Sequence, residues 1–228
     1  MKICVPVMAG SSGEALMKMG SAFSLADFVE LRVDRIENPD LGRLLAGRNN
    51  KKIIVTNRRR DEGGFFEGTE KERIELLKEA VRLGAGYVDI EAATEPFYVK
   101  DIAKAIEDRG ATKLIVSSHN QTGTPGDRAL QKTLVACRSL GADIVKVVTT
   151  ARTPEDNLKV LRLIPYARRK GLEVIAFCMG DKGRISRVAA PFFGSFLSFA
   201  SLDRGEESAP GQMTVEEMRQ VLRLLFTA

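Results

Sequence analysis

Residues 144–179 read IVKVVTTARTPEDNLKVLRLIPYARRKGLEVIAFCM, and this stretch predicts one complete strand–helix–strand unit. Its two ends, Ile144–Thr149 and Glu173–Met179, are short runs of β-branched and apolar residues, which are typical of buried strands. Between them a helix is predicted over Pro154–Arg169, because Thr153 can cap it, proline suits its first position and Gly171 follows its end. Units of this kind build an α/β fold.

The same alternation recurs along the whole chain of 228 residues. Six more strands are predicted, at Lys2–Ala9, Phe28–Asp34, Lys52–Arg58, Tyr87–Ala92, Lys113–Asn120 and Ser195–Ser201. The clearest further helices are predicted at Thr69–Leu83, Phe97–Arg109, Pro125–Leu140 and Thr214–Phe226. Eight such units indicate a barrel or a doubly wound sheet. The absence of a linker and of a GxGxxG motif after the first strand favours a single (β/α)₈ TIM barrel as one domain, residues 1–228.

Composition narrows the classes of function. The net charge is +5, but the 35 basic and 30 acidic residues are interspersed, and the densest basic run is only Arg58-Arg59-Arg60. We therefore expect no nucleic-acid partner, whereas a small anionic substrate suits this surface. No apolar run reaches the roughly 18 residues that span a bilayer, and the N-terminus does not resemble a signal peptide. Three cysteines without CxxC pairing and a single histidine predict a cytoplasmic protein with no disulfide and no metal site.

The apolar residues of each strand predict which side chains enter the barrel. Alternate residues point inward, and the set that faces the helices must be apolar, such as Val29, Leu31 and Val33 in the second strand. The same rule places inside the barrel Glu30, Arg32, Asp34, Thr56, Arg58, Asp89, Glu91, Ser117, His119, Ile144, Lys146 and Val148. Ionisable groups near the C-terminal strand ends indicate an active site. The alternative is a self-neutralising ion network, since buried charges must be paired.

Lys146 is the strongest single indication of chemistry. Its inward neighbours Ile144 and Val148 are apolar, and an apolar setting favours the neutral amine that attacks carbonyl groups. His119 ends the adjacent strand, within reach of that amine, and an imidazole suits proton transfer near neutral pH. The alternatives are that Lys146 only pairs with Glu30 or Glu91, and that His119 is structural.

Six motifs along the chain resemble those of type I 3-dehydroquinate dehydratases. They occur in the family's order and span nearly the whole sequence. The motifs are Glu30-Leu31-Arg32-x-Asp34, Arg58-x₃-Glu62-Gly63-Gly64, Ser117-Ser118-His119, Asp143-x₂-Lys146, Met179-Gly180-x₃-Arg184-x-Ser186-Arg187 and Ser208-Ala209-Pro210-Gly211-Gln212.

The resemblance implies dehydration of 3-dehydroquinate to 3-dehydroshikimate in the shikimate pathway, by a homodimer, with no metal or organic cofactor. It implies that Lys146 forms an imine with the substrate ketone and that His119, beside Glu62, moves the protons. Arg187 would hold the substrate carboxylate, because a guanidinium grips that group with two hydrogen bonds. The remaining residues would bind ring hydroxyls or close over the substrate: Glu30, Arg32, Arg58, Ser208 and Gln212.

Several features leave alternatives open. Asn120-Gln121 follow His119 where the family often has an aspartate, and the chain begins at its first strand, so we expect no N-terminal hairpin plug. Arg58 and Glu62 can be read as solvated loop charges. Residues 203–212 are predicted to form a mobile lid, with an ordinary surface loop as the alternative. A class I aldolase-like lyase would share Lys146 but needs a phosphate site. A basic binding module would form no imine.

Overall fold

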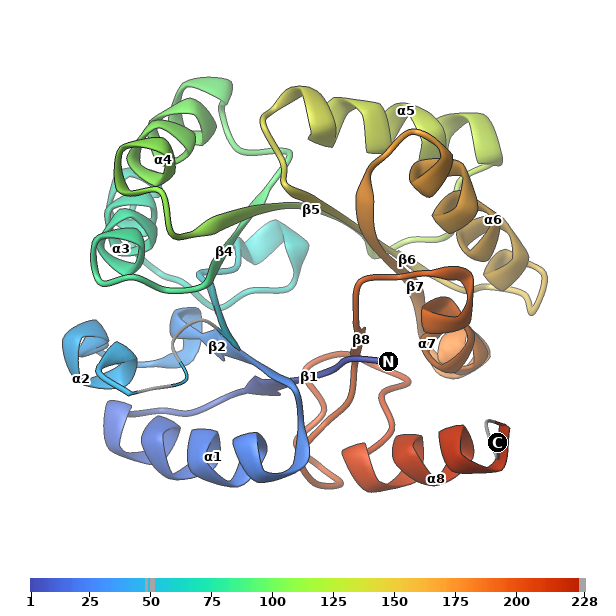
Figure 1. Cartoon of the computed structure of the whole chain (residues 1–228), viewed down its shortest axis with the longest axis horizontal. Coiled ribbons are helices and arrows are strands. Elements are labelled where there is room, and N and C mark those ends of the chain that lie inside the picture. The colour runs from blue at the N-terminus through green and yellow to red at the C-terminus, as the bar shows by residue number, and fades with distance from the viewer. Residues whose placement is uncertain (48, 50–51, 226–228) are drawn as a thin grey trace.

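The computed structural model of the protein describes residues 1–47, 49 and 52–225, and these form a nearly closed barrel. Within this part of the chain, eight parallel strands follow the order β7-β6-β5-β4-β3-β2-β1-β8 (Figure 1). The ring closes between its first and last members, where the Phe196 backbone N–H donates to the Val174 carbonyl at 2.8 Å. The predicted (β/α)₈ barrel is therefore confirmed.

The strands lie close to the predicted ranges. Their bounds are β1 Ile3–Val7, β2 Phe28–Arg32, β3 Ile53–Thr56, β4 Tyr87–Glu91, β5 Lys113–Asn120, β6 Ile144–Thr150, β7 Glu173–Met179 and β8 Ser198–Phe199. The second strand is shorter than predicted, because Val33–Arg35 turns into a 3₁₀ helix, η1. Asp34 is therefore not an inward strand residue; its carboxylate instead binds Arg32 and the Phe65 backbone N–H.

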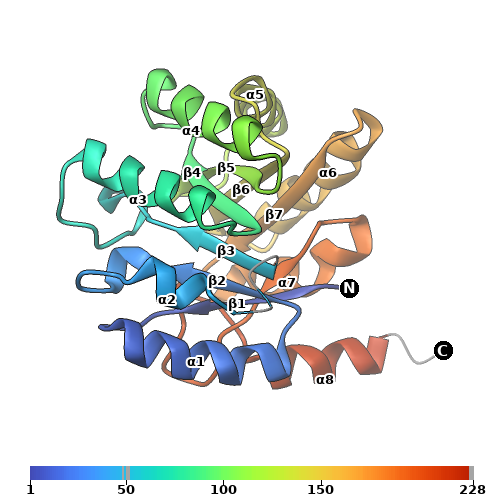
Figure 2. The same ribbon diagram turned by 60° about the vertical axis from the view of Figure 1, so that its left-hand side comes forward.

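The helices surround the sheet, as Figure 2 shows from the side. They are α1 Ser12–Leu25, α2 Leu41–Leu45, α3 Glu70–Arg82, α4 Pro96–Arg109, α5 Asp127–Ser139, α6 Asp156–Arg169, α7 Arg184–Ala189 and α8 Val215–Leu225, with the short 3₁₀ helices η3 Arg60–Glu62, η4 Asp181–Gly183 and η5 Ala190–Phe193. Phe226, the predicted end of the last helix, lies outside the described residues. None of the helices in the described chain is long and apolar enough to cross a bilayer.

Two predicted helix starts were wrong by two residues. The α5 helix begins at Asp127, because the Thr124 hydroxyl donates to the Thr150 carbonyl at 2.9 Å instead of capping the helix. The α6 helix begins at Asp156, whose own carboxylate accepts the backbone N–H groups of Arg152 and Thr153. The helix has no side-chain cap, and Thr153 does not act as one.

Apart from Asp34, the inward and outward faces predicted for the second to sixth strands are confirmed. Val29, Leu31 and the matching residues of the other strands pack with the helices in one large apolar core. A second, smaller cluster fills the lower barrel interior with Ile54, Ile115 and Ile144 and extends upward to Val148 and Phe177.

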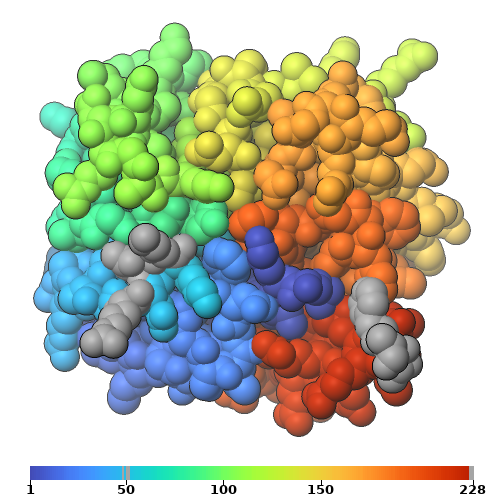
Figure 3. All heavy atoms as spheres, viewed as in Figure 1, coloured from blue at the N-terminus to red at the C-terminus, as the bar shows by residue number. Residues whose placement is uncertain are grey.

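An aromatic group closes the base of the barrel, the end at which the strands begin. The ring centroids of Phe28, Tyr87 and Phe196 lie 5.6 to 5.9 Å apart. The Lys2 ammonium lies 4.2 Å from the Phe196 ring, so the N-terminal segment covers the centre of this face (Figure 3). The mouth, at the opposite end, is left for the site.

Candidate active site

One cavity of about 230 Å³ at the mouth of the barrel brings the predicted site residues together. It is lined by every residue singled out from the sequence: Lys146, His119, Glu62, Glu30, Arg32, Arg58, Arg187, Ser208 and Gln212. These side chains come from strands β2, β5 and β6, from the segment just after β3, from η3 and α7, and from the loop before α8. Parallel strands direct their C-terminal ends to one face, which is why segments distant in sequence meet there.

Lys146 is buried between two carboxylates. Its Nζ lies 3.0 Å from Glu30 Oε1 and 2.9 Å from Asp89 Oδ2, and it sits 4.5 Å from the Phe199 ring. The apolar setting expected from the sequence is therefore only partly right. Pairing with Glu30 is found, but the second partner is Asp89 and not Glu91.

The tilt of the strands explains that difference. Lys146 is in register with Ser117, and Ser117 with Glu91, so a flat sheet would place Lys146 level with Glu91. In a barrel the strands tilt against the axis, so residues in register on successive strands lie at different heights. Two strands away, the inward residue level with Lys146 is Asp89.

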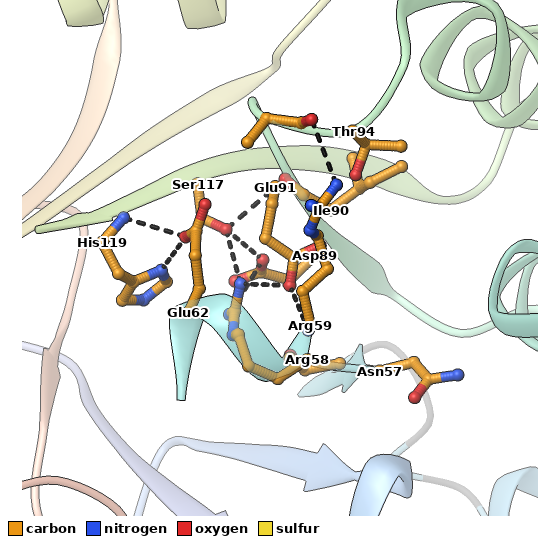
Figure 4. A network of polar contacts seen from close by, with 12 residues as sticks. Asn57, Arg58, Arg59, Glu62, Asp89, Ile90, Glu91, Thr94, Ser117 and His119 are labelled. Carbon is orange, nitrogen blue, oxygen red and sulfur yellow. Dashed lines mark hydrogen bonds and ion pairs between the residues drawn. The ribbon is translucent and has the colours of Figure 1, made fainter. Parts of the chain in front are cut away.

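His119 and Glu62 form a tight pair at the cavity wall. Glu62 Oε2 lies 2.7 Å from the imidazole Nδ1 and 2.9 Å from the His119 backbone nitrogen (Figure 4). An ionised Glu62 accepts both N–H groups, which places the ring proton on Nδ1 and leaves the Nε2 lone pair free. Two glycines set this geometry: Gly63 has a positive φ of 84°, and a Cβ at Gly64 would overlap the Arg58 carbonyl.

Burial opposes charge on both members of this pair. Burial raises the pKa of Glu62 to about 7, against the opposing effect of the Arg58 charge. Burial also lowers the pKa of His119 well below its ordinary value, and the nearby charges of Arg58 and Lys146 lower it further. His119 is therefore neutral near pH 7, as a general base must be.

Arg58 is fixed by a fully charged network. Burial by itself would lower the pKa of Arg58, but the Asp89 and Glu91 carboxylates hold it well above its ordinary value. Burial would likewise raise the pKa of Asp89, but Arg58 and Lys146 hold it well below its usual range. With Arg58 only 3% exposed and Glu62 buried against His119, the interpretation of both as solvated loop charges is wrong.

Arg187 has hydrogen-bond donors without acceptors. It is fully buried, and its Nε and Nη1 have no hydrogen-bond partner among the residues that the structure describes. Its Nη2 donates to the Pro210 carbonyl at 3.3 Å. Burial lowers the pKa of Arg187 to about 10. A buried guanidinium is costly without an anionic partner. Since this one lines the cavity, it is suited to bind an anionic ligand.

The loop over residues 203–212 lies against the mouth of the barrel. Ser208 and Gln212 bond to each other and line the cavity, so it is not an ordinary surface loop. Gly211 packs so closely on the Gly180 carbonyl that a Cβ would overlap it. The anchors along the loop are polar, among them the ion pair of Arg204 with Glu217.

Sequence reasoning missed some residues of the cavity. Asp89 was placed inside the barrel but was not recognised as a partner of Lys146. Gln121, which follows His119 by two residues, lines the cavity and donates weakly to the Glu62 carbonyl at 3.4 Å. Phe199 was missed because β8 is too short to show alternation. Among the residues that the structure describes, no three His, Cys, Asp or Glu side chains are grouped as metal ligands.

The fold and the cavity together define a class: a (β/α)₈-barrel enzyme with a buried amine, a neutral imidazole and an arginine with unpartnered donors around one small space. Comparison with known proteins specifies the family within this class. The sequence model of the family described as type I 3-dehydroquinase matches residues 3–228. The chain belongs to the type I 3-dehydroquinase family, and it is a lyase.

Three relatives illustrate the similarity. The 3-dehydroquinate dehydratase of Pyrococcus abyssi is 38% identical over 223 residues, which cover 98% of each chain. The crystal structure of 3-dehydroquinate dehydratase from Geobacillus kaustophilus is similar with a TM-score of 0.88 at 32% identity, covering 98% of this chain and 90% of that one. The type I enzyme from Clostridium difficile, solved with covalently modified comenic acid, has a TM-score of 0.88 at 26% identity and covers 98% and 91%.

Proposed function

We propose that this protein dehydrates 3-dehydroquinate to 3-dehydroshikimate, in the shikimate pathway, through an imine on Lys146. The observation that carries the proposal is the buried Arg187, which has unpartnered N–H donors and lines the same cavity as Lys146. A substrate with a carboxylate at one end and a ketone at the other satisfies both groups. The covalent ligand in the Clostridium difficile relative supports covalent chemistry in this family.

The proposed reaction follows from the positions of Lys146 and His119. The Lys146 amine loses a proton, attacks the ketone at C3 and releases water as the imine forms. The protonated imine withdraws electrons and so acidifies the adjacent C2–H. The Nε2 lone pair of His119 removes this proton, and the same nitrogen then protonates the C1 hydroxyl, which leaves as water. Hydrolysis of the imine returns the free amine.

The remaining cavity residues position the substrate in this proposal. Glu30, Arg32 and Arg58 bind ring hydroxyls, and Arg32 is held for this by its two bonds to Asp34. Ser208 and Gln212 close over the substrate from the loop before α8 and exclude water from the hydrolysable imine. That loop acts as the lid.

Borohydride trapping with 3-dehydroquinate, followed by peptide mapping, tests the proposal. We expect one reduced adduct, on Lys146, and none with the Lys146→Ala variant. Formation of the enone chromophore, followed in parallel, distinguishes dehydration from aldol cleavage. A stable adduct on another lysine, or trapping with a phosphorylated keto sugar in preference to 3-dehydroquinate, would refute the assignment.

Two further expectations concern location and assembly. We propose that the protein works in the cytoplasm, which rests on its cysteine usage, and as a homodimer, which rests on the resemblance alone. Light scattering of the purified protein tests the assembly, with an expected mass of twice the chain's 25.0 kDa. A single-chain mass at working concentration would contradict it.

A further inference from the structure

Arg73 is a buried charge that the proposed reaction does not use. It lies in the first turn of α3, behind a capping box formed by Thr69 and Glu72, and is 1% exposed. All of its N–H groups are bonded. The acceptors are the Asn57 carbonyl at 2.8 Å, Glu91 Oε2 at 2.7 Å, Thr94 Oγ1 at 2.8 Å, and both carboxylate oxygens of Glu70 at 2.8 and 2.9 Å.

Glu91 connects Arg73 to the cavity. One of its oxygens accepts from Arg73, and the other accepts from Arg58 Nη1 at 2.8 Å and from the Arg59 backbone N–H at 3.0 Å (Figure 4). Glu91 is completely buried, so this carboxylate lies between two guanidinium groups without water. Its position, and therefore that of Arg58, depends on both arginines.

Arg58 in turn faces the reacting groups. Its other contacts are Asp89 Oδ1 at 3.0 Å and the Ser117 hydroxyl at 2.8 Å, and its guanidinium lines the cavity. The charges acting on the Glu62–His119 pair come from several elements. They are Arg32 of β2, Arg58 just after β3, Asp89 and Glu91 of β4 and Lys146 of β6. The Cys137 thiol of α5 responds to the Glu62 charge.

We propose that Arg73 is a positioning residue for the reaction: through Glu91 it holds Arg58 in place and so sets the protonation of the Glu62–His119 pair. This inference rests on the proposed function. A purely structural arginine would stabilise the junction of α3 with β4 but would not affect the pH at which the enzyme becomes active. The two roles therefore differ in a measurable property.

The direction of the effect follows from the charges. Without Arg73 the negative charge of Glu91 is less compensated. Because the charge of Glu91 raises the pKa of Glu62, ionisation of Glu62 moves to higher pH. For Arg73→Met we expect kcat to fall by roughly tenfold, and the acid limb of the pH profile to move up by about half a pH unit or more.

The matched control is Lys78→Met on the same helix. Lys78 pairs with Glu75 and with Asp101 of α4 and has no contact with the network. The Lys78→Met substitution should leave kcat, KM and the pH profile unchanged. Arg73→Lys keeps the charge but loses most of the hydrogen bonds, so the limb should return close to its wild-type position while kcat stays intermediate.

Thermal unfolding of each variant keeps the test decisive, because loss of Arg73 leaves Glu91 Oε2 buried without its donor, which can prevent folding of Arg73→Met. In that case Arg73→Met/Glu91→Gln is compared with Glu91→Gln alone, and a further fall in kcat with a raised KM in the double variant carries the test. An unchanged acid limb and kcat in a folded Arg73→Met, or equal kcat and KM in the double variant and in Glu91→Gln, would show that Arg73 is only structural. Absence of a trapped adduct on Lys146 in the wild type would instead refute the proposed function.

Discussion

The two halves of the barrel interior are built on the same strands but have opposite chemistry. Near the base, the inward residues are apolar, as with Ile144 on β6 and Tyr87 on β4. Two residues further along the same strands, the inward residues are Lys146 and Asp89, which pair with each other. The inward side chains therefore change from apolar to charged between two successive inward positions of the same strand.

This difference shows what stabilises each half. The base is held by aromatic and aliphatic packing, which tolerates no charge without a partner. The mouth keeps its charges because each is matched by an opposite one or by several donors, as Arg58 is by Asp89 and Glu91. Arg187 is the exception, and its orphaned donors mark the place for a ligand. A change at the mouth should thus alter chemistry, and a change at the base should alter stability.

Lys146→Ala should have the largest effect. Turnover of 3-dehydroquinate should fall below detection, because Lys146 is the only lysine among the described residues that line the cavity, while binding of a carboxylate ligand at Arg187 persists. Lys146→Arg should fail as well, because a guanidinium stays protonated and forms no imine. Steady-state assays and calorimetric titration measure the two properties. Measurable turnover by Lys146→Ala would place the chemistry elsewhere.

His119→Ala should reduce the rate by roughly 10²–10⁴ while still forming the imine slowly. The physical reason is loss of proton transfer without loss of the amine. Single-turnover kinetics combined with borohydride trapping separates the two steps. If this variant turned over near the wild-type rate, His119 would have only a structural role.

The Glu62–His119 pair should give the enzyme an acid limb near neutral pH. Because burial raises the pKa of Glu62 to about 7, its carboxylate ionises as pH rises through that value, and only then does Nε2 become the basic nitrogen. We expect kcat/KM to increase with pH up to about 7. In Glu62→Gln this acid limb of the pH profile should disappear, and the activity should be lower at every pH. An acid limb that persists in Glu62→Gln would have to arise from the ionisation of another side chain.

Phe28→Leu tests the base of the barrel. The substitution removes the ring contacts with Tyr87 and Phe196, so the free energy of unfolding should fall by about 1–2 kcal/mol. kcat and KM should not change, because the ring lies below the charged layer. Urea unfolding measures the free energy of unfolding, and steady-state kinetics measures kcat and KM. A large change in kcat would show that the two halves are coupled.

The smallest effect should be on proteolysis of the lid. Trypsin should cut after the exposed Arg204 faster in the free enzyme than after borohydride trapping, because closure orders the loop. The Arg109–Gly110 bond, at the end of α4 on the base side, is the matched control and should be cut equally in both states. Equal rates at Arg204 would remove the lid from the proposal and leave Lys146 unaffected.

Much of the site was predictable because it depends on local periodicity. Alternation along β2, β5 and β6 placed Glu30, His119 and Lys146 inside the barrel, and the structure confirms that they share one cavity. Pairwise contacts were not predictable. The partner of Lys146 depends on strand tilt, and the course of the chain at Asp34 depends on its bond to Arg32.

The sequence by itself determined the number of units, the faces of the second to sixth strands apart from Asp34, and most residues of the site, since a repeat of two along a strand requires no knowledge of its neighbours. Only the tertiary structure decided which charges meet. Glu91 holds Arg58 and Arg73, Asp89 holds Lys146, and the Arg187 donors stay unpaired. The reason is geometric: these contacts join strands and helices whose relative heights are set by barrel closure, and no local pattern records them.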